Sequence, residues 1–177
     1  MREFTPKLGE GWADQETPTQ EIVEVDLTAL EKHGIQPLAD TVDAHGLMTQ
    51  IDQEQQVGYG KFFGFGYHSI AKEGRDEVDV EKTDTDAYRE IAGTPGFYGY
   101  FPGQKDMDRK CTTICIWKDI ETASNTLKNS PMHAVAVDKA PEFYDVGVLE
   151  YVDIDYTPDG TTVSHIMPPF EFNLNPA

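Results

Sequence analysis

Apolar and polar residues alternate with a period of two in four segments of the chain, and this pattern predicts β-strands. The segments are residues 61–70, 97–101, 111–117 and 146–156. The third segment, CTTICIW, is the clearest, because β-branched and aromatic residues occur throughout it. We therefore predict a sheet built around these four strands.

Helical patterns and capping residues lie between the predicted strands. Asp119 is placed to cap a helix that runs to about residue 129. Ser130 and Pro131 restart the helix as N-cap and first helical residue, and we expect its second part to end before Pro141. Shorter helices are predicted at residues 28–33, 37–50 and 86–91, and a solvated loop at residues 73–86. Together the segments predict an α+β fold.

One domain with two peripheral arms is the expected organisation. Residues 1–20 are polar and rich in Pro, Gly and Glu, which is typical of a flexible or draped arm. Residues 21–160 form the predicted α+β domain, which opens with a strand at residues 21–27 and has its core at residues 61–156. Residues 161–177 are expected to wrap over the surface or over a neighbouring molecule.

The charge balance narrows the range of partners. The chain has 32 acidic and 14 basic residues, which gives a formal net charge of −18. Such a field repels polyphosphates and anionic membranes, and no stripe of Lys and Arg offsets it. We therefore expect neither nucleic acid nor a membrane as partner, and we interpret the acidity mainly as a source of solubility.

Cysteine use and hydropathy indicate the cytoplasm. The N-terminal residues lack the apolar core of a secretory signal, and no apolar run reaches the roughly 18 residues of a membrane span. Cys111 and Cys115 would lie about 13 Å apart on one strand, which is beyond the reach of a disulfide. Two free thiols fit a reducing compartment. A metal site would need further ligands nearby, so we predict none.

Two ionisable side chains are expected on apolar faces. Glu150 shares a strand face with Val148 and Val152, and His133 shares a helix face with Ala140. A buried carboxyl or imidazole group needs a partner or changes its pKa, and a changed pKa is what a general acid or base requires. Both residues also have a structural interpretation. Glu150 could lie near an open edge of the sheet or pair with Lys or Arg, and His133 could hydrogen-bond a carbonyl. We expect the two to approach one another if the helix crosses this face.

Residues 61–70, KFFGFGYHSI, place His68 on the same strand face as Gly64 and Gly66. Glycines on one face leave room for a ligand, or equally for a packed helix. His68 is thus a third catalytic candidate. Several aromatic residues would line a cavity for an aromatic ligand, although each is also an ordinary core residue: Phe65, Tyr98, Tyr100, Trp117, Tyr144 and Tyr151. His165, in the tail, is either solvated or caps a pocket.

Residues 61–156 resemble the dimeric α+β barrel superfamily, which includes antibiotic-biosynthesis-type monooxygenases. The runs CTTICIW, DIETASNTLKNSPMHAVAV and DVGVLEYVDI carry the resemblance: an aromatic residue ends a strand, a broken helix contains Ser130 and His133, and a strand follows. The resemblance implies a ferredoxin-like sandwich with an antiparallel sheet, a homodimer formed through the sheets, and a ligand cavity between helices and sheet. Only His133 and Trp117 carry over residue by residue, and the N-terminal extension of residues 1–60 is atypical.

The leading hypothesis is a cytoplasmic, homodimeric enzyme that needs no cofactor and acts on a hydrophobic or aromatic small molecule by acid–base chemistry. The outcome would be oxygenation, as in a monooxygenase, or the reaction of a cyclase, isomerase or lyase in a biosynthetic pathway. Glu150 or His133 would be the base, with His68 and Tyr98 or Tyr144 polarising an oxygen. The alternatives are a haem-binding protein with His133 as axial ligand, and a non-catalytic small-molecule-binding or stress-response module.

Overall fold

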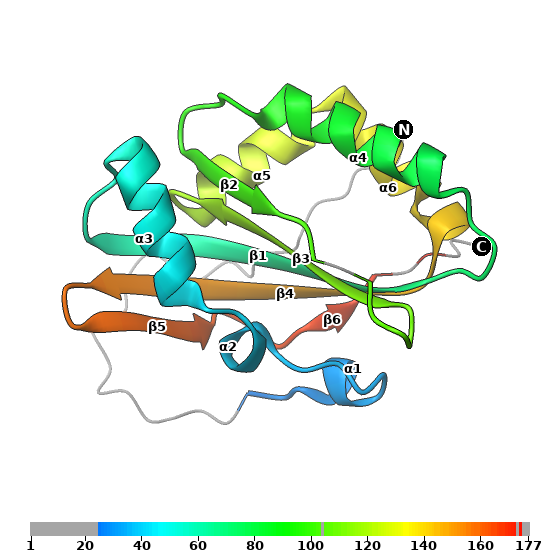
Figure 1. Cartoon of the computed structure of the whole chain (residues 1–177), viewed down its shortest axis with the longest axis horizontal. Coiled ribbons are helices and arrows are strands. Elements are labelled where there is room, and N and C mark those ends of the chain that lie inside the picture. Colours follow the sequence, from blue (N-terminus) through cyan, green and yellow to red (C-terminus); the bar gives the residue numbers. More distant parts are fainter. Residues whose placement is uncertain (1–24, 104, 173, 175–177) are drawn as a thin grey trace, which may run out of the picture.

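A computed structural model describes residues 25–103, 105–172 and 174 (Figure 1). Its strands are β1 (Gly60–Ala71), β2 (Phe97–Phe101), β3 (Lys110–Trp117), β4 (Tyr144–Thr157), β5 (Gly160–His165) and β6 (Phe170–Glu171). Its helices are α1 (Thr28–Glu31), α2 (Leu38–Thr41), α3 (Ala44–Gln55), α4 (Glu77–Ile91), α5 (Ile120–Lys128) and α6 (Pro131–Phe143).

The six strands form one antiparallel sheet. Its order is β2-β3-β1-β4-β5, and β6 also pairs with β4. From β1 to β4 the chain runs strand, helix, strand, strand, two consecutive helices, strand, with β1 and β3 inside the sheet. The expected α+β class and antiparallel sheet are confirmed, and the arrangement is consistent with a ferredoxin-like fold.

Both faces of the sheet are covered. Helices α4, α5 and α6 lie over one face, and α1, α2 and α3 lie over the other (Figure 1). Because successive side chains of a strand point to opposite faces, neighbouring residues enter different cores. Phe62 and Val152 pack with Leu38, Met48 and Ile51 on the α1–α3 side. On the α4–α6 side, the core comprises Phe63, Ile91, Cys115, Trp117 and Ala123.

The covered second face changes the expectation of a dimer. A dimeric α+β barrel pairs the open sheet faces of two subunits. In the part of this chain that the structure describes, α1–α3 occupy that face, and Leu30, Leu38, Met48 and Ile51 are almost completely buried there. A homodimer stays a prediction, but it would need a different surface.

The four predicted strands and both predicted caps are confirmed. Asp119 accepts a hydrogen bond from the Thr122 amide at 2.7 Å. Ser130 Oγ accepts one from the His133 amide at 3.1 Å, and Pro131 occupies the first turn of α6. These caps satisfy amides that the helices themselves leave without partners.

The predicted boundaries of two helices were wrong. Helix α4 begins at Glu77, within the expected loop, because Asp76 caps the Val78 and Asp79 amides and acidic residues suit a first turn. Helix α6 continues through Pro141 to Phe143. The proline removes one intrahelical donor, that for the Val137 carbonyl, close to the end of the helix, and Lys72 donates to the Pro141 carbonyl at 2.5 Å.

The expected C-terminal tail belongs to the sheet instead. Residues 160–165 and 170–171 form β5 and β6, which extend the sheet beyond β4. The arm at residues 1–20 lies outside the described residues, as does most of the strand expected at 21–27, whose last three residues form no strand. Among the described residues, no helix is both long and apolar enough to cross a membrane.

Candidate functional site

Glu150 and His68 meet on the α1–α3 side of the sheet. Their strands β4 and β1 are neighbours, and Gly66 lies directly opposite Glu150 in the register. His68 Nε2 lies 2.6 Å from Glu150 Oε2, and both side chains are buried. An imidazole and a carboxyl group therefore do converge in the apolar interior, as predicted, but the imidazole is that of His68.

Two more strands extend this contact into a network. Thr112 Oγ1 on β3 lies 2.9 Å from His68 Nδ1. His165 Nε2 on β5 lies 2.7 Å from Glu150 Oε1, although the two groups are not aligned as a hydrogen bond. We call Thr112, His68, Glu150 and His165 the Glu150 network. The tail histidine thus caps a buried carboxylate, while the contribution of Thr112 had no signal in the sequence.

Glycine in β1 allows a helix to approach this network. A Cβ atom on Gly66 would lie 2.7 Å from Leu38 Cδ1, so the missing side chain makes room for α2. The Leu38 amide donates to both oxygens of Glu150, each at 3.1 Å. The sequence left open whether the glycines make room for a ligand or for a packed helix, and at Gly66 it is a packed helix.

The Glu150 network has the features of a structural element. Every oxygen of the carboxylate has a donor within 3.1 Å, which offsets the cost of burial. Neither of the two best-defined hollows on the described surface is lined by His68 or Glu150. A substrate would have to displace α2 to reach either group.

His133 lies on the other side of the sheet. Helix α6 belongs to the α4–α6 layer (Figure 1), whereas Glu150 accepts hydrogen bonds from the Leu38 amide of α2 on the opposite side. The expected approach of His133 to Glu150 was therefore wrong, because the sheet separates them. His133 is half-buried on α6, and burial lowers the pKa of its imidazole.

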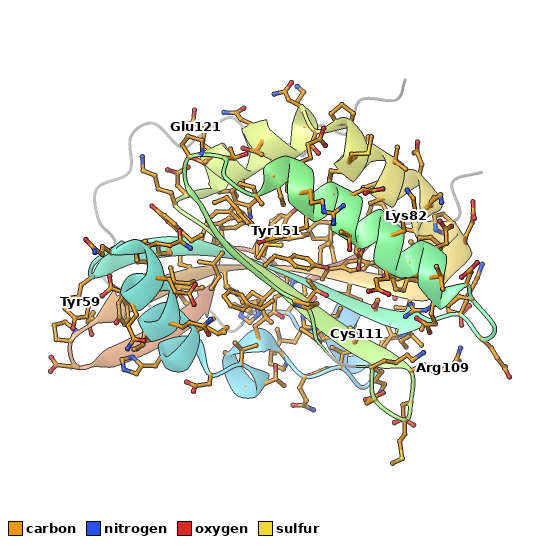
Figure 2. All side chains as sticks on the ribbon, turned by 45° about the horizontal axis from the view of Figure 1, so that its top comes forward. Tyr59, Lys82, Arg109, Cys111, Glu121 and Tyr151 are labelled. Carbon is orange, nitrogen blue, oxygen red and sulfur yellow. The ribbon has the colours of Figure 1, made fainter. Side chains whose placement is uncertain are left out.

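The predicted aromatic residues also divide between the faces. Phe65, Tyr100, Trp117 and Tyr151 pack in the core beneath α4–α6, and Figure 2 shows Tyr151 between the helices and the sheet. Tyr98 instead packs edge-on against Phe62 on the α1–α3 side. The sheet therefore separates most of the expected substrate-binding residues from His68 and Glu150.

A groove on the α4–α6 side holds a carboxyl group with altered chemistry. The groove has a volume of about 400 Å³ and is lined by one stripe of α4 and the end of β2: Glu77, Val80, Glu81, Asp84, Thr85, Tyr88, Tyr100 and Pro102. We call it the α4 groove. The volume falls within the range of small-molecule sites, about 300–1,000 Å³.

Asp84 is the chemically distinctive residue of the α4 groove. Burial raises the pKa of its carboxyl, and the Tyr100 hydroxyl and the Arg75 charge oppose the rise. The Tyr100 hydroxyl lies 3.4 Å from Asp84 Oδ2, a long hydrogen bond that leaves the carboxylate incompletely satisfied. Burial and the Asp84 charge together raise the pKa of Tyr100. A lined hollow with a perturbed carboxyl is a functional-site candidate.

Behind Asp84 lies a cluster of polar groups, which we call the Arg75 cluster: Arg75, Tyr67 and Tyr144. The Arg75 guanidinium lies over the Tyr144 ring, 5.2 Å from its centroid, and the Tyr67 and Tyr144 rings are 5.5 Å apart, edge to face. Burial raises the pKa of Tyr144 to about 12, and the Asp84 charge contributes to the rise.

The Arg75 cluster contains buried donors without partners. Arg75 Nε, Arg75 Nη1 and the Tyr67 hydroxyl find no hydrogen-bond partner among the residues that the structure describes. Each such group costs about 1–3 kcal/mol unless water or a ligand satisfies it. Asp84 and Arg75 were not among the predicted site residues, because the acidic composition of residues 73–86 predicts a solvated loop. The spacing of Val80, Asp84 and Tyr88, which fits one face of a helix, was the signal available in the sequence.

Within the described ranges, no group of three His, Cys, Asp or Glu side chains is arranged to hold a metal ion. Cys115 is buried, which raises the pKa of its thiol to about 12, and Cys111 is half-buried with a raised pKa. High thiol pKa values disfavour the thiolate form that binds metals.

Comparisons with known proteins give a family but no activity. A crystal structure of the NE2512 protein of unknown function from Nitrosomonas europaea is similar at a TM-score of 0.45 and 15% sequence identity, covering 54% of this chain and 91% of that one. This match is too distant to support a conclusion about fold or activity. No curated protein matches. The PB2B2.08-like family model matches residues 17–167. Since that match extends over most of the chain, the protein belongs to the PB2B2.08-like family.

Proposed function

We propose that this protein binds a hydrophobic or aromatic small molecule in the α4 groove and catalyses a proton transfer with Asp84 as the base. The proposal keeps the acid–base chemistry expected from the sequence and moves its site from Glu150 and His133 to Asp84. One observation carries it: Asp84 lines a hollow of about 400 Å³ with a pKa raised by burial.

The surroundings of Asp84 support this role. A carboxylate with a raised pKa is a stronger base than an exposed one, and proton transfer is most efficient when the pKa lies near the working pH. Tyr100 donates only a long hydrogen bond to Asp84, so its hydroxyl is available to a ligand oxygen. In the proposed step Asp84 Oδ2 accepts the proton of an acidic C–H or O–H bond, and Tyr100 donates to the oxygen that gains charge.

The aromatic lining supports an aromatic or polycyclic ligand. Tyr88 and Tyr100 both line the α4 groove, with ring centroids 5.6 Å apart. Tyr88 is also among the large apolar residues exposed to solvent. Aromatic ligands stack on such rings, which contributes about 0.5–1.5 kcal/mol per pair beyond area burial.

The test is hydrogen–deuterium exchange of an enolisable aromatic ketone. We expect the protein to accelerate exchange at C1 of 2-tetralone in D₂O, followed by proton NMR. Asp84→Asn keeps the shape of the side chain but removes the base, so the rate should fall by about 10²–10⁴-fold. Asp86→Asn is the matched control, because Asp86 lies on the same helix and pairs with Lys82 instead. Equal exchange rates for D84N and the parent would contradict the assignment of the base.

Binding without turnover would favour the non-catalytic alternative. In that case the parent and D84N would both bind aromatic ligands, and neither would accelerate exchange. Quenching of protein fluorescence by 2-naphthol measures this binding separately from the chemistry. Loss of binding in Tyr100→Phe and Tyr88→Ala would still place the ligand in the α4 groove.

A haem-binding function is the second candidate. One observation favours it: burial lowers the pKa of the half-buried His133, and neutral imidazole is the form that ligates iron. A Soret band in haem-reconstituted protein that is lost in His133→Ala would support it. A protein that takes up no haem would exclude it. The homodimer and the cytoplasmic location also stay predictions, the first to be measured by sedimentation velocity.

A further inference from the structure

Arg75 has more donor capacity than its surroundings use. Its Nη2 atom bonds Glu77 at 2.9 Å, while Nε and Nη1 are buried and lack partners within the described part of the chain. The exposed fraction of the side chain is only 8%. Buried donors in native proteins are nearly always paired, with protein groups, water or a ligand. Arg75 therefore indicates a missing acceptor.

The chemistry of the unused donors indicates that this acceptor is an anion. A guanidinium is always charged, and its planar fork of N–H groups matches the two oxygens of a carboxylate. Glu77, the carboxylate that Arg75 binds, also pairs with Lys105 at 2.5 Å, so two cations share this acceptor. The nearby Lys139 pairs with Asp79 at 2.7 Å. Nε and Nη1 of Arg75 are therefore left for a further acidic group.

The Arg75 guanidinium is bound to a lining residue of the α4 groove. Glu77, the partner of Arg75, is itself a lining residue of the groove. The charge of Arg75 also acts on Asp84, whose carboxyl lines the same hollow. A ligand that lies against Asp84 and Tyr100 can therefore extend towards the guanidinium.

We propose that the ligand of the α4 groove is an aromatic or hydrophobic carboxylic acid whose carboxylate is bound by Arg75. This inference rests on the proposed function of the groove and names the class of molecule that it accepts. Glu81 and Asp84, which line the same groove, repel a singly charged carboxylate less than they would repel a doubly charged phosphate. The planar guanidinium stacked on Tyr144 also suits a planar carboxylate.

Tyr67 provides a second donor for the same group. Its hydroxyl is buried without a partner among the described residues, and its ring packs on Tyr144, the residue that also contacts Arg75. Gly147 leaves space for this hydroxyl, since a Cβ atom there would lie 2.8 Å from it. Nε and Nη1 of Arg75 and the hydroxyl of Tyr67 are thus unused donors on two residues that both contact Tyr144.

The test compares two probes that differ only in charge, 2-naphthoate and 2-naphthamide, by isothermal titration calorimetry on the full chain at pH 7. The parent should bind the acid about 10- to 100-fold more tightly than the amide, as expected for charge-assisted hydrogen bonds. Arg75→Gln should abolish this preference by weakening the acid and leaving the amide nearly unchanged. Arg89→Gln, which removes an exposed arginine of α4, should preserve it.

Each outcome separates this inference from the proposed function. If the parent binds both probes equally, or R75Q keeps the preference for the acid, the carboxylate assignment is wrong while the groove stands. If neither probe binds, the proposed function fails with it. Should R75Q not fold, Arg75→Lys and Tyr67→Phe decide the same question, because each keeps most of the packing but removes donors. Both should reduce the preference for the acid several-fold, and an unchanged preference would overturn the inference.

Discussion

Removing Glu150 tests whether its network is structural. In Glu150→Leu the Leu38 amide and His68 Nε2 lose their common acceptor, and both stay buried. Each unsatisfied donor costs about 1–3 kcal/mol, and breaking a buried pair by removing one partner costs about 3–5 kcal/mol in total. We therefore expect the free energy of unfolding to fall by about 3–5 kcal/mol, a large fraction of the 5–15 kcal/mol of a typical domain.

The double variant distinguishes pairing from simple loss of packing. In His68→Leu the carboxylate of Glu150 keeps the Leu38 amide but loses its imidazole partner. When both residues are leucine, neither side chain of the pair is left buried without its partner, so the double variant should be more stable than the sum of the single effects predicts. The expected coupling is about 1–3 kcal/mol.

Urea unfolding followed by circular dichroism at pH 7 measures all three variants. Glu121→Gln is the control, because Glu121 is exposed on α5 (Figure 2) and should change stability by less than about 0.5 kcal/mol. Purely additive single effects, or a Glu150→Leu variant as stable as the parent, would refute the reasoning. A folded Glu150→Gln variant that no longer exchanges 2-tetralone would instead return the catalytic role to the Glu150 network.

Three further predictions follow from burial. Burial raises the pKa of Asp84 above its ordinary value near 3.8, so this group favours folding at low pH, and the benefit is lost as the pH rises through the raised pKa. Asp84→Asn should therefore be more stable than the parent at pH 7, with a smaller gain in stability towards pH 4. A gain that does not vary with pH in urea titrations would contradict this. Gly66→Ala should lower the free energy of unfolding by about 1–3 kcal/mol through the clash with Leu38. Gly60→Ala is the control, because a Cβ atom there meets nothing within 4 Å. Equal melting temperatures of Gly66→Ala and the parent would disprove the role of the glycine. Cys115 should react with Ellman's reagent only after unfolding, since burial raises the pKa of its thiol to about 12, and rapid labelling of the native protein would exclude that environment.

Local patterns identified most of the elements that local forces determine. The alternation in residues 61–70 and 146–156 corresponds to β1 and β4, because a strand between two cores repeats every two residues. The caps at Asp119 and Ser130 were readable because they depend only on adjacent amides. Helix α4 was mistaken for a loop because its polar, acidic sequence is stabilised by its cap and by packing on one side, and composition alone emphasises the solvated side.

The candidate site was only partly predictable. Periodicity predicts that Glu150 and His68 each lie on an apolar strand face. Their contact depends on the register of β1 against β4, which periodicity does not determine. Assigning His133 to the same site failed because periodicity shows that a helix face is buried but not which side of the sheet it covers. Arg75 was missed because the lack of a partner is a property of its neighbours in space.

The amino-acid sequence by itself determined the α+β class, the four central strands, the starts of α5 and α6 and the acidic composition, since each depends on the residues themselves or on neighbours within a few positions. The tertiary structure alone decided that α1–α3 cover the second face of the sheet, that residues 160–171 add strands to it, and that Asp84 and Arg75 lie beside a groove. The reason is physical: side-chain periodicity and capping act over one or two turns, whereas burial, register and unpaired charge arise from segments that are distant along the chain.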